Sequence, residues 1–340
     1  MSEITEGMIM EVLEKLTAAF GVSGRENEIN QIITDLVKDY VDEVITDGID
    51  NVIAIKKGYG EEKKRIMISV HKDEIGFMVM NIDSDGFINL RPIGGIPVSL
   101  SIGNRIIFRN GTVGVLSFKK DVENIKNNNV GDMFADIGAK NKEDALKYIK
   151  PGDVGSYYGP LCMLKNDRVV AKALDNRIGC YVAIKALTEN TKPYNDIYYV
   201  FTSQEELGLK GAIVASRVVK PEIAVAVDVT SSFDTPVTKE GNAVLGGGTA
   251  IKIMDRSVIC DESLIHIMQD ICKTEDIAYQ SDILAAGGTD AGAIYTSNEG
   301  VRTGGLSIPM RYVHGPVGVV DMNDVKACIA LLKSFVNQKI

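Results

Sequence analysis

Charged side chains gather in five short clusters, each of which follows a run of apolar and β-branched residues. The clusters are His71-Lys72-Asp73-Glu74, Asp175-Asn176-Arg177, Glu205-Glu206, Asp228 at the end of IAVAVDV, and His314 shortly after GLSIP. Sites in α/β proteins form at the carboxyl ends of strands, where polar loops stand on a rigid sheet. Together the clusters offer imidazole nitrogens and carboxylate oxygens, which suit a divalent metal or proton transfer.

His71 and Asp73 follow the strand predicted at residues 65–70 (RIMISV). Residues two apart on an extended segment share a face, so the Asp73 carboxylate can orient the His71 imidazole or support it from behind. An ordinary solvated loop is the alternative, and this motif alone does not decide between the two.

Glu205 and Glu206 follow the strand predicted from IYYVFTS. Two adjacent carboxylates are costly to bury there without cations. If the segment is extended, their side chains diverge, so that one can bind a metal and the other can face a water molecule as general base. The alternative is the first turn of the helix predicted near residue 209, where glutamate is favoured. Asp228 has a similar alternative as a cap of the next turn.

The remaining motifs are better explained by structural roles than by catalysis or ligand binding. His266 lies in an amphipathic helical pattern without acidic or histidine neighbours, so it is left out of the site. The glycine runs at 246–249 and 287–292 lack a phosphate-loop lysine and are interpreted as turns, although residues 287–290 could line a substrate pocket with backbone N–H groups. Five cysteines without CxxC spacing predict reduced, buried thiols. They are Cys162, Cys180, Cys260, Cys272 and Cys328.

Length, charge and composition limit the classes of protein to which this chain can belong. A chain of 340 residues exceeds the usual size of one core, so a second domain is expected. The formal charge of −9, with no Lys/Arg cluster, argues against a nucleic-acid partner. The N-terminal MSEITEGMIM lacks a signal-peptide pattern, and no stretch of about 18 apolar residues is present. We therefore expect a cytoplasmic protein with no membrane partner.

The elements that must position these residues follow an α/β order. Helices are predicted at 8–19 and after a Ser23-x-x-Glu26 capping box, followed by strands near 43–47, 51–57 and 65–70. Residues 76 to about 159 change to short alternating strands and turns, with one helix near 142–149. Strand and helix then alternate, with helices near 177–190, 209–217, 262–274 and 323–337 and strands near 197–203, 223–229, 249–254 and 305–309. This order predicts an α/β domain with a small β-rich insertion.

Six segments in this order resemble the M42 metallopeptidases, the glutamyl, deblocking and tetrahedral-type aminopeptidases. The segments are VHKDEIGFMV, KALDNRIGC, QEELGLKGA, VAVDVT, AAGGTDAGAI and SIPMRYVHGPVGVVDMND. The resemblance covers essentially the whole chain. It implies a mixed-sheet, zinc-peptidase-like catalytic domain at 1–75 and 163–340. It also implies an inserted small β-barrel or PDZ-like domain at 76–162, through which relatives dimerise and many build dodecamers, so a homo-oligomer is expected.

Carried over residue by residue, the resemblance implies a dinuclear site. One metal is held by His71, Asp175 and Asp228, and the second by Asp175, Glu206 and His314, with Asp175 bridging. Glu205 is then the general base, and Asp73 a supporting catalytic residue. The implied reaction is hydrolysis of the N-terminal bond of short peptides by metal-activated water.

The metal and the preferred substrate stay open at this point. The ligand set suits two zinc or cobalt ions, with manganese possible. Glutamyl, leucyl and lysyl preferences all remain.

The chain departs from the family pattern at three positions, none of which is a ligand. Asn176 replaces the usual Asp, Lys72 stands inside the H-x-D motif, and Gly315 follows the last histidine. Relatives often have a cis peptide after the bridging ligand, so a cis Asp175–Asn176 bond is predicted.

Two other functions are alternatives to the peptidase. A glycoside hydrolase would use two carboxylates about 5 to 10 Å apart, without histidines or metals. A peptide-binding scaffold would have lost its metal site.

Overall fold

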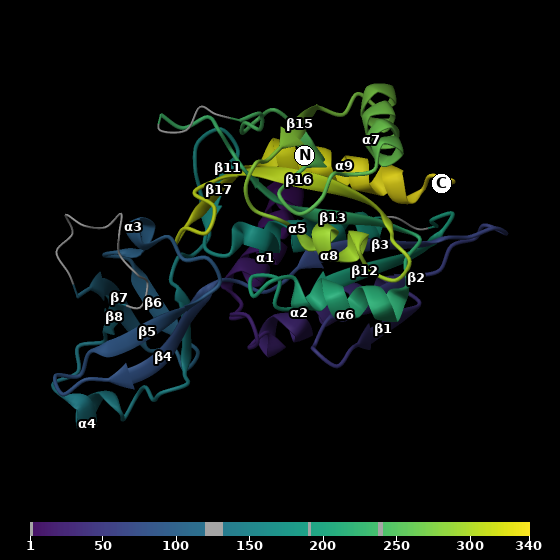
Figure 1. The fold of residues 1–340 in the computed structure, drawn as a ribbon. Coiled ribbons are helices and arrows are strands. Elements are labelled where there is room, and N and C mark those ends of the chain that lie inside the picture. The colour runs from purple at the N-terminus through teal and green to yellow at the C-terminus, as the bar shows by residue number, and fades with distance from the viewer. Residues whose placement is uncertain (1–2, 120–131, 190–191, 237–240) are drawn as a thin grey trace.

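The computed structural model describes residues 3–119, 132–189, 192–236 and 241–340. Within these ranges, eleven strands form one large mixed sheet (Figure 1). They are β1 (Glu43–Thr46), β2 (Val52–Lys56), β3 (Arg65–His71), β10 (Cys162–Met163), β11 (Arg168–Ala171), β12 (Asp196–Thr202), β13 (Ile223–Ser231), β14 (Thr249–Met254), β15 (Tyr279–Ile283), β16 (Arg302–Arg311) and β17 (Gly318–Asp321).

The sheet runs in the order β1-β2-β12-β3-β13-β16-β17-β11-β10, with β14 paired to β16 and β15 paired to β14. Its four central strands, β12, β3, β13 and β16, are mutually parallel. Their register sets Thr202 beside His71 and Asp228 beside Ser307. The loops that leave these strands therefore meet at one edge of the sheet, which is where the sequence predicts the site.

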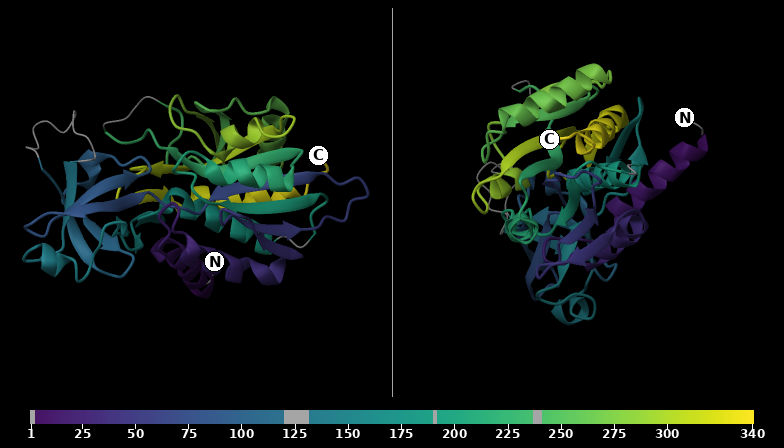
Figure 2. Two further views of the ribbon diagram at one scale, coloured as in Figure 1. Left: turned by 60° about the horizontal axis from the view of Figure 1, so that its bottom comes forward. Right: turned by 90° about the vertical axis from the view of Figure 1, so that its right-hand side faces the viewer.

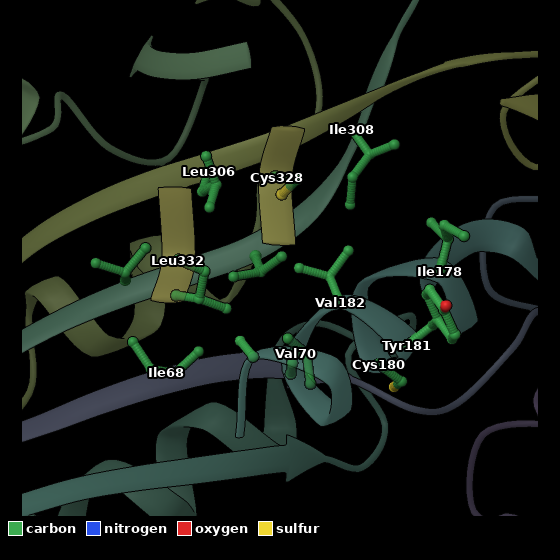
Figure 3. Packing of buried hydrophobic residues seen from close by; sticks show 14 of the residues in the cluster. Ile68, Val70, Ile178, Cys180, Tyr181, Val182, Leu306, Ile308, Cys328 and Leu332 are labelled. Atoms are coloured by element: carbon green, nitrogen blue, oxygen red, sulfur yellow. The ribbon is translucent and has the colours of Figure 1, made fainter. Parts of the chain in front are cut away.

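Helices cover both faces of the sheet. One face carries α1 (Glu3–Ala18), α2 (Asn27–Val37), α5 (Leu174–Glu189), α7 (Glu262–Thr274) and α9 (Met322–Val336), and the other carries α6 (Lys210–Val219) and α8 (Asp290–Tyr295). A one-turn 3-10 helix, η1 (Lys38–Tyr40), follows α2. Figure 3 shows how Ile68 and Val70 of β3 pack with Val182 of α5 and Leu332 of α9 in the larger core. Strands buried on both faces explain why their sequences are nearly continuous apolar runs.

A closed six-stranded barrel forms one end of the elongated molecule (Figure 2, left). Its strands are β4 (Gly76–Ile82), β5 (Ile88–Ile93), β6 (Arg105–Phe108), β7 (Val113–Phe118), β8 (Met133–Asp136) and β9 (Val154–Tyr157), and it carries the single-turn helices α3 (Val98–Ser101) and α4 (Lys142–Ala145). The barrel has a core of its own around Phe77, Phe108 and Leu116. The α/β fold with an inserted small barrel is thus confirmed, whereas the PDZ and zinc-peptidase likenesses stay predictions.

Three local predictions were wrong, and some short strands were not predicted. Helix α2 begins at Asn27, and Glu26 caps it without a side-chain hydrogen bond, so no capping box forms. The helix expected at 142–149 ends at Ala145. Strands β15 and β17 were not anticipated. All five cysteines are free thiols, but Cys162 is exposed.

None of the helices in the described ranges has both the length and the apolar stretch needed to cross a membrane.

Candidate metal and catalytic site

All seven residues selected from the sequence come together at the predicted sheet edge. His71 ends β3 and Asp228 lies in β13. The other positions are Asp73 two residues beyond β3, Asp175 at the start of α5, Glu205 and Glu206 in the loop from β12 to α6, and His314 in the loop from β16 to β17. His266 lies on the exposed side of α7, outside this group.

The imidazoles and carboxylates form two triads that share Asp175. In the first, His71 Nε2 lies 3.0 Å from Asp175 Oδ1 and 3.6 Å from Asp228 Oδ1. In the second, His314 Nε2 lies 3.5 Å from Asp175 Oδ2 and 3.4 Å from Glu206 Oε2. The candidate ligand atoms of each triad are all within 4.8 Å of one another. Each Asp175 oxygen therefore faces a different histidine, which is the arrangement that a bridging carboxylate requires.

The peptide bond between Asp175 and Asn176 is cis, as predicted. Asn176 uses both ends of its amide, because Nδ2 donates to the Val227 carbonyl at 2.8 Å and Oδ1 accepts from Gly179 N at 3.1 Å. The first contact ties the start of α5 to the residue before Asp228. An ionised aspartate at this position would have no proton for the Val227 carbonyl, so the link depends on the asparagine amide.

His314 is oriented by a segment that belongs to the inserted barrel. Its Nδ1 lies 2.8 Å from the Gly95 carbonyl, an acceptor, so Nδ1 carries the proton and Nε2 is left free toward Asp175. A Cβ at Gly95 would lie 2.9 Å from this Nδ1, and one at Gly94, where φ is +81°, would lie 3.2 Å from Glu206 Oε2. Sequence reasoning missed this contact, although the glycine pair in RPIGGIP was its signal.

Asp73 is fully buried and holds several parts of the site at once. One oxygen, Oδ1, lies 3.5 Å from His71 Nδ1 and accepts from Glu205 N at 3.0 Å. The other, Oδ2, accepts from Glu206 N at 3.2 Å and from the Ser23 hydroxyl at 2.5 Å. One carboxylate thus joins the β3 end to the backbone of both glutamates, and Ser23, the expected helix cap, supports it.

Crowded carboxylates dominate the electrostatics of the site. Burial, together with the Asp175 charge, raises the pKa of Glu206 to about 8, and burial with the Asp228 charge raises the pKa of Glu205 well above its usual range. Burial opposes protonation of His71 and His314, but the surrounding carboxylates raise the pKa of both imidazoles. Several negative charges share this small space, so bound cations would stabilise it.

A cleft of about 480 Å³ opens directly onto these residues. Beyond the two triads and Glu205, its lining includes the apolar residues Leu209, Leu284, Ala286 and Val313. The predicted turn at 287–289 also lines it, immediately before α8. The two triads can therefore be reached from outside the protein through this cleft.

Comparisons with known proteins agree with the fold and show the family of the chain. The model of the M42 glutamyl aminopeptidase family matches residues 50–331, and the chain belongs to this family. It is 34% identical to a lysyl aminopeptidase of Pyrococcus furiosus over 96% of both chains.

Two solved structures are similar over nearly their whole length. An aminopeptidase of Desulfurococcus kamchatkensis superposes with a TM-score of 0.93 at 36% identity, covering 98% of this chain and 95% of that one. A Pyrococcus horikoshii TET1 peptidase superposes with a TM-score of 0.84 at 29% identity, covering 97% and 99%. Aminopeptidase activity is the function that this family membership supports.

Proposed function

We propose that this protein is a dinuclear metallo-aminopeptidase that removes N-terminal residues from short peptides. The observation that carries the proposal is the pair of triads, His71-Asp175-Asp228 and Asp175-Glu206-His314, which meet at one shared carboxylate. Three carboxylates and two imidazoles, without a thiolate, suit zinc or cobalt, with manganese possible.

The side chains fit two divalent ions by chemistry as well as by position. The Nε2 atoms of His71 and His314 face the carboxylates, while their Nδ1 atoms face Asp73 and the Gly95 carbonyl, the kind of backing that metal-ligating histidines have. Ions bound there would polarise the scissile carbonyl and make a water molecule more acidic.

Glu205 is the proposed general base. Its carboxylate belongs to neither of the two triads, yet it lies within 4.8 Å of candidate ligand atoms on His71 and Glu206. It accepts a proton from the attacking water and delivers that proton to the nitrogen of the departing peptide. The buried Asp73, which accepts from Glu205 N, fixes the loop that presents this carboxylate.

Metal analysis of the purified protein, followed by a panel of aminoacyl chromogenic substrates, tests the proposal. We expect close to two ions per chain and hydrolysis that a chelator abolishes and zinc, cobalt or manganese restores. A scaffold with a lapsed site would bind no metal. Release of reducing sugar that resists chelation would instead support the glycosidase alternative.

Asp73→Asn should weaken metal binding, because the amide lacks the charge and one of the two acceptor oxygens that serve His71, Glu205 and Glu206. Loss of such a supporting contact costs about 10- to 100-fold in metal affinity or activity. Titration with a zinc-sensitive dye measures the affinity. Asp261→Asn is the matched control, since Asp261 caps α7 and accepts from Leu264 N and the Ser263 hydroxyl. Equal zinc affinities of the two variants would contradict a positioning role for Asp73.

Metal affinity should rise between pH 6 and pH 8. Glu206, whose pKa is about 8 in the fold, and His314, whose pKa is raised, hold protons that an incoming ion must displace. Each displaced proton gives about a tenfold change in affinity per pH unit while the group is protonated. Calorimetric titration with zinc in buffers of different ionisation enthalpy measures the released protons.

The same pKa shifts determine how the stability of the metal-free fold changes with pH. A histidine with a raised pKa stabilises the fold below about pH 6.5, and this contribution is lost as pH rises through the folded pKa. The raised Glu206 pKa acts in the same direction, because the metal-free fold loses stability as the pH rises from the unfolded pKa of about 4.5 to the folded pKa of about 8. The gain in melting temperature on adding zinc should therefore be larger at pH 8 than at pH 6. An equal gain at both values would contradict the assigned shifts.

We also propose that residues 76–162 form a dimerisation domain and that the chain assembles as a homo-oligomer. The solved TET1 peptidase of Pyrococcus horikoshii is described as assembling into a tetrahedron or an octahedral shell. Here, Val113 and Val115 alternate outward on β7 of the barrel and are each more than 40% exposed. Light scattering of the intact protein measures the oligomer size.

A further inference from the structure

We propose that the cleft selects peptides whose first residue has an uncharged aliphatic side chain, and that a buried Lys252–Asp282 ion pair enforces this choice. The inference rests on the proposed aminopeptidase function and names its substrate class. It is carried by the charges of the described residues around the cleft.

Lys252 is the one charged residue among the described cleft-lining residues that is neither a candidate ligand nor the proposed base. Its ammonium lies 2.6 Å from Asp282 Oδ2, and both side chains are only 1% exposed. The other Asp282 oxygen accepts from the Thr230 hydroxyl at 2.9 Å. The cation is therefore matched by a partner inside the protein and is not free to bind an acidic substrate.

The ion pair is positioned beside the metal triads by the sheet. Lys252 on β14 stands next to Asp282 on β15 in the parallel register. Thr230, which also lines the cleft, lies two residues after Asp228 on β13, so the two side chains share a face of that strand. Thr230 thus lies between the candidate metal ligand Asp228 and the Asp282–Lys252 ion pair. Because the two charges of the pair balance, this part of the cleft is neutral.

Charged first residues are disfavoured for a physical reason. A glutamyl carboxylate needs a free cation in the cleft, and a lysyl ammonium needs a free anion, whereas the described lining offers neither away from the metal triads and Glu205. Placing an unpaired charge against Leu209 and Leu284 costs its desolvation, while an aliphatic side chain gains from the same contacts. The predicted selectivity therefore differs from that of the lysyl aminopeptidase relative and from the glutamyl activity in the family's name.

The first experiment compares leucyl, valyl, glutamyl and lysyl p-nitroanilides with the zinc-loaded protein. We expect kcat/KM for the leucyl substrate to exceed kcat/KM for each of the two charged substrates by at least about tenfold. Free leucine should likewise raise the melting temperature more than glutamate or lysine, a readout that needs no turnover. Glutamyl or lysyl hydrolysis that equals or exceeds leucyl hydrolysis overturns the inference but leaves the aminopeptidase proposal intact. Failure of the metal-loaded protein to hydrolyse any substrate overturns both.

The second experiment removes the negative charge that pairs with Lys252. Asp282→Asn leaves the Lys252 ammonium without its anion, so the ratio of glutamyl to leucyl kcat/KM should rise at least about tenfold. The double variant Lys252→Met/Asp282→Leu removes both charges and should keep the leucyl preference, and melting curves report whether each variant folds. An unchanged ratio in a folded Asp282→Asn protein, or a double variant that prefers glutamyl substrate, contradicts the role of the pair.

Discussion

Glu205→Gln should remove most turnover while the protein keeps two ions per chain. Glutamine is nearly the same size and shape as glutamate, but its neutral amide cannot take a proton from water at neutral pH. Positioned general bases contribute about 10²- to 10⁴-fold to rate, so a loss of kcat in this range is expected. Steady-state kinetics on the best chromogenic substrate, combined with metal analysis of the same sample, measure both quantities.

Two further variants separate the base from a ligand. Glu206→Gln should lose metal as well as activity, because Glu206 Oε2 belongs to the second triad, 3.4 Å from His314 Nε2. Glu262→Gln makes the same chemical change on the exposed side of α7 and should leave the rate unchanged. Full activity of Glu205→Gln would falsify the base assignment, and loss of an ion from it would make Glu205 a ligand instead.

Much of the fold was predictable because the central strands are buried on both faces. The runs at 65–70, 197–203 and 223–229 appear in the structure as β3, β12 and β13, shifted by at most two residues at their ends. Helix α7 was predicted at its observed bounds, since its apolar residues recur at helical spacing. Strands β15 and β17 were missed because they are short and owe their conformation to neighbouring strands that sequence periodicity does not reveal.

Errors arose where a distant partner outweighed a local pattern. Ser23 and Glu26 have the spacing of a capping box, but the Ser23 hydroxyl donates to Asp73 and Glu26 Oε1 accepts from Gln204 N. These partners lie 50 and 178 residues away along the chain. A local motif therefore predicted the wrong role for residues that in fact support the site.

The site was predictable in its residues and less so in its geometry. The resemblance supplied the positions, but only the fold shows that each Asp175 oxygen faces a different histidine. Asp290 is an example of a contact that the sequence does not reveal. Its carboxylate accepts hydrogen bonds from the Ser69 and Thr202 hydroxyls beneath the site. Burial raises its pKa to about 6. The sequence suggested a turn here, with backbone N–H groups toward a pocket, and no role for the carboxylate, since both hydroxyl donors come from strands far away in the chain.

Asp175→Ala should empty both metal positions, which no other single ligand change is expected to do. Asp175 Oδ1 lies 3.0 Å from His71 Nε2 and Oδ2 lies 3.5 Å from His314 Nε2, so one truncation removes a ligand from each triad. Metal content should fall from about two ions to nearly none, and activity by more than about a thousandfold. Asp228→Ala removes a ligand from the first triad alone and should keep one ion.

The control for this prediction is His266→Ala, which removes an imidazole outside the site and should retain both ions and full activity. Melting curves of the metal-free proteins show whether Asp175→Ala still folds, so that metal loss can be separated from unfolding. Asp175→Asn retains one oxygen and should keep more metal than the alanine variant. If Asp175→Ala keeps one tightly bound ion, the two positions do not depend on a shared carboxylate, and the bridging role is wrong.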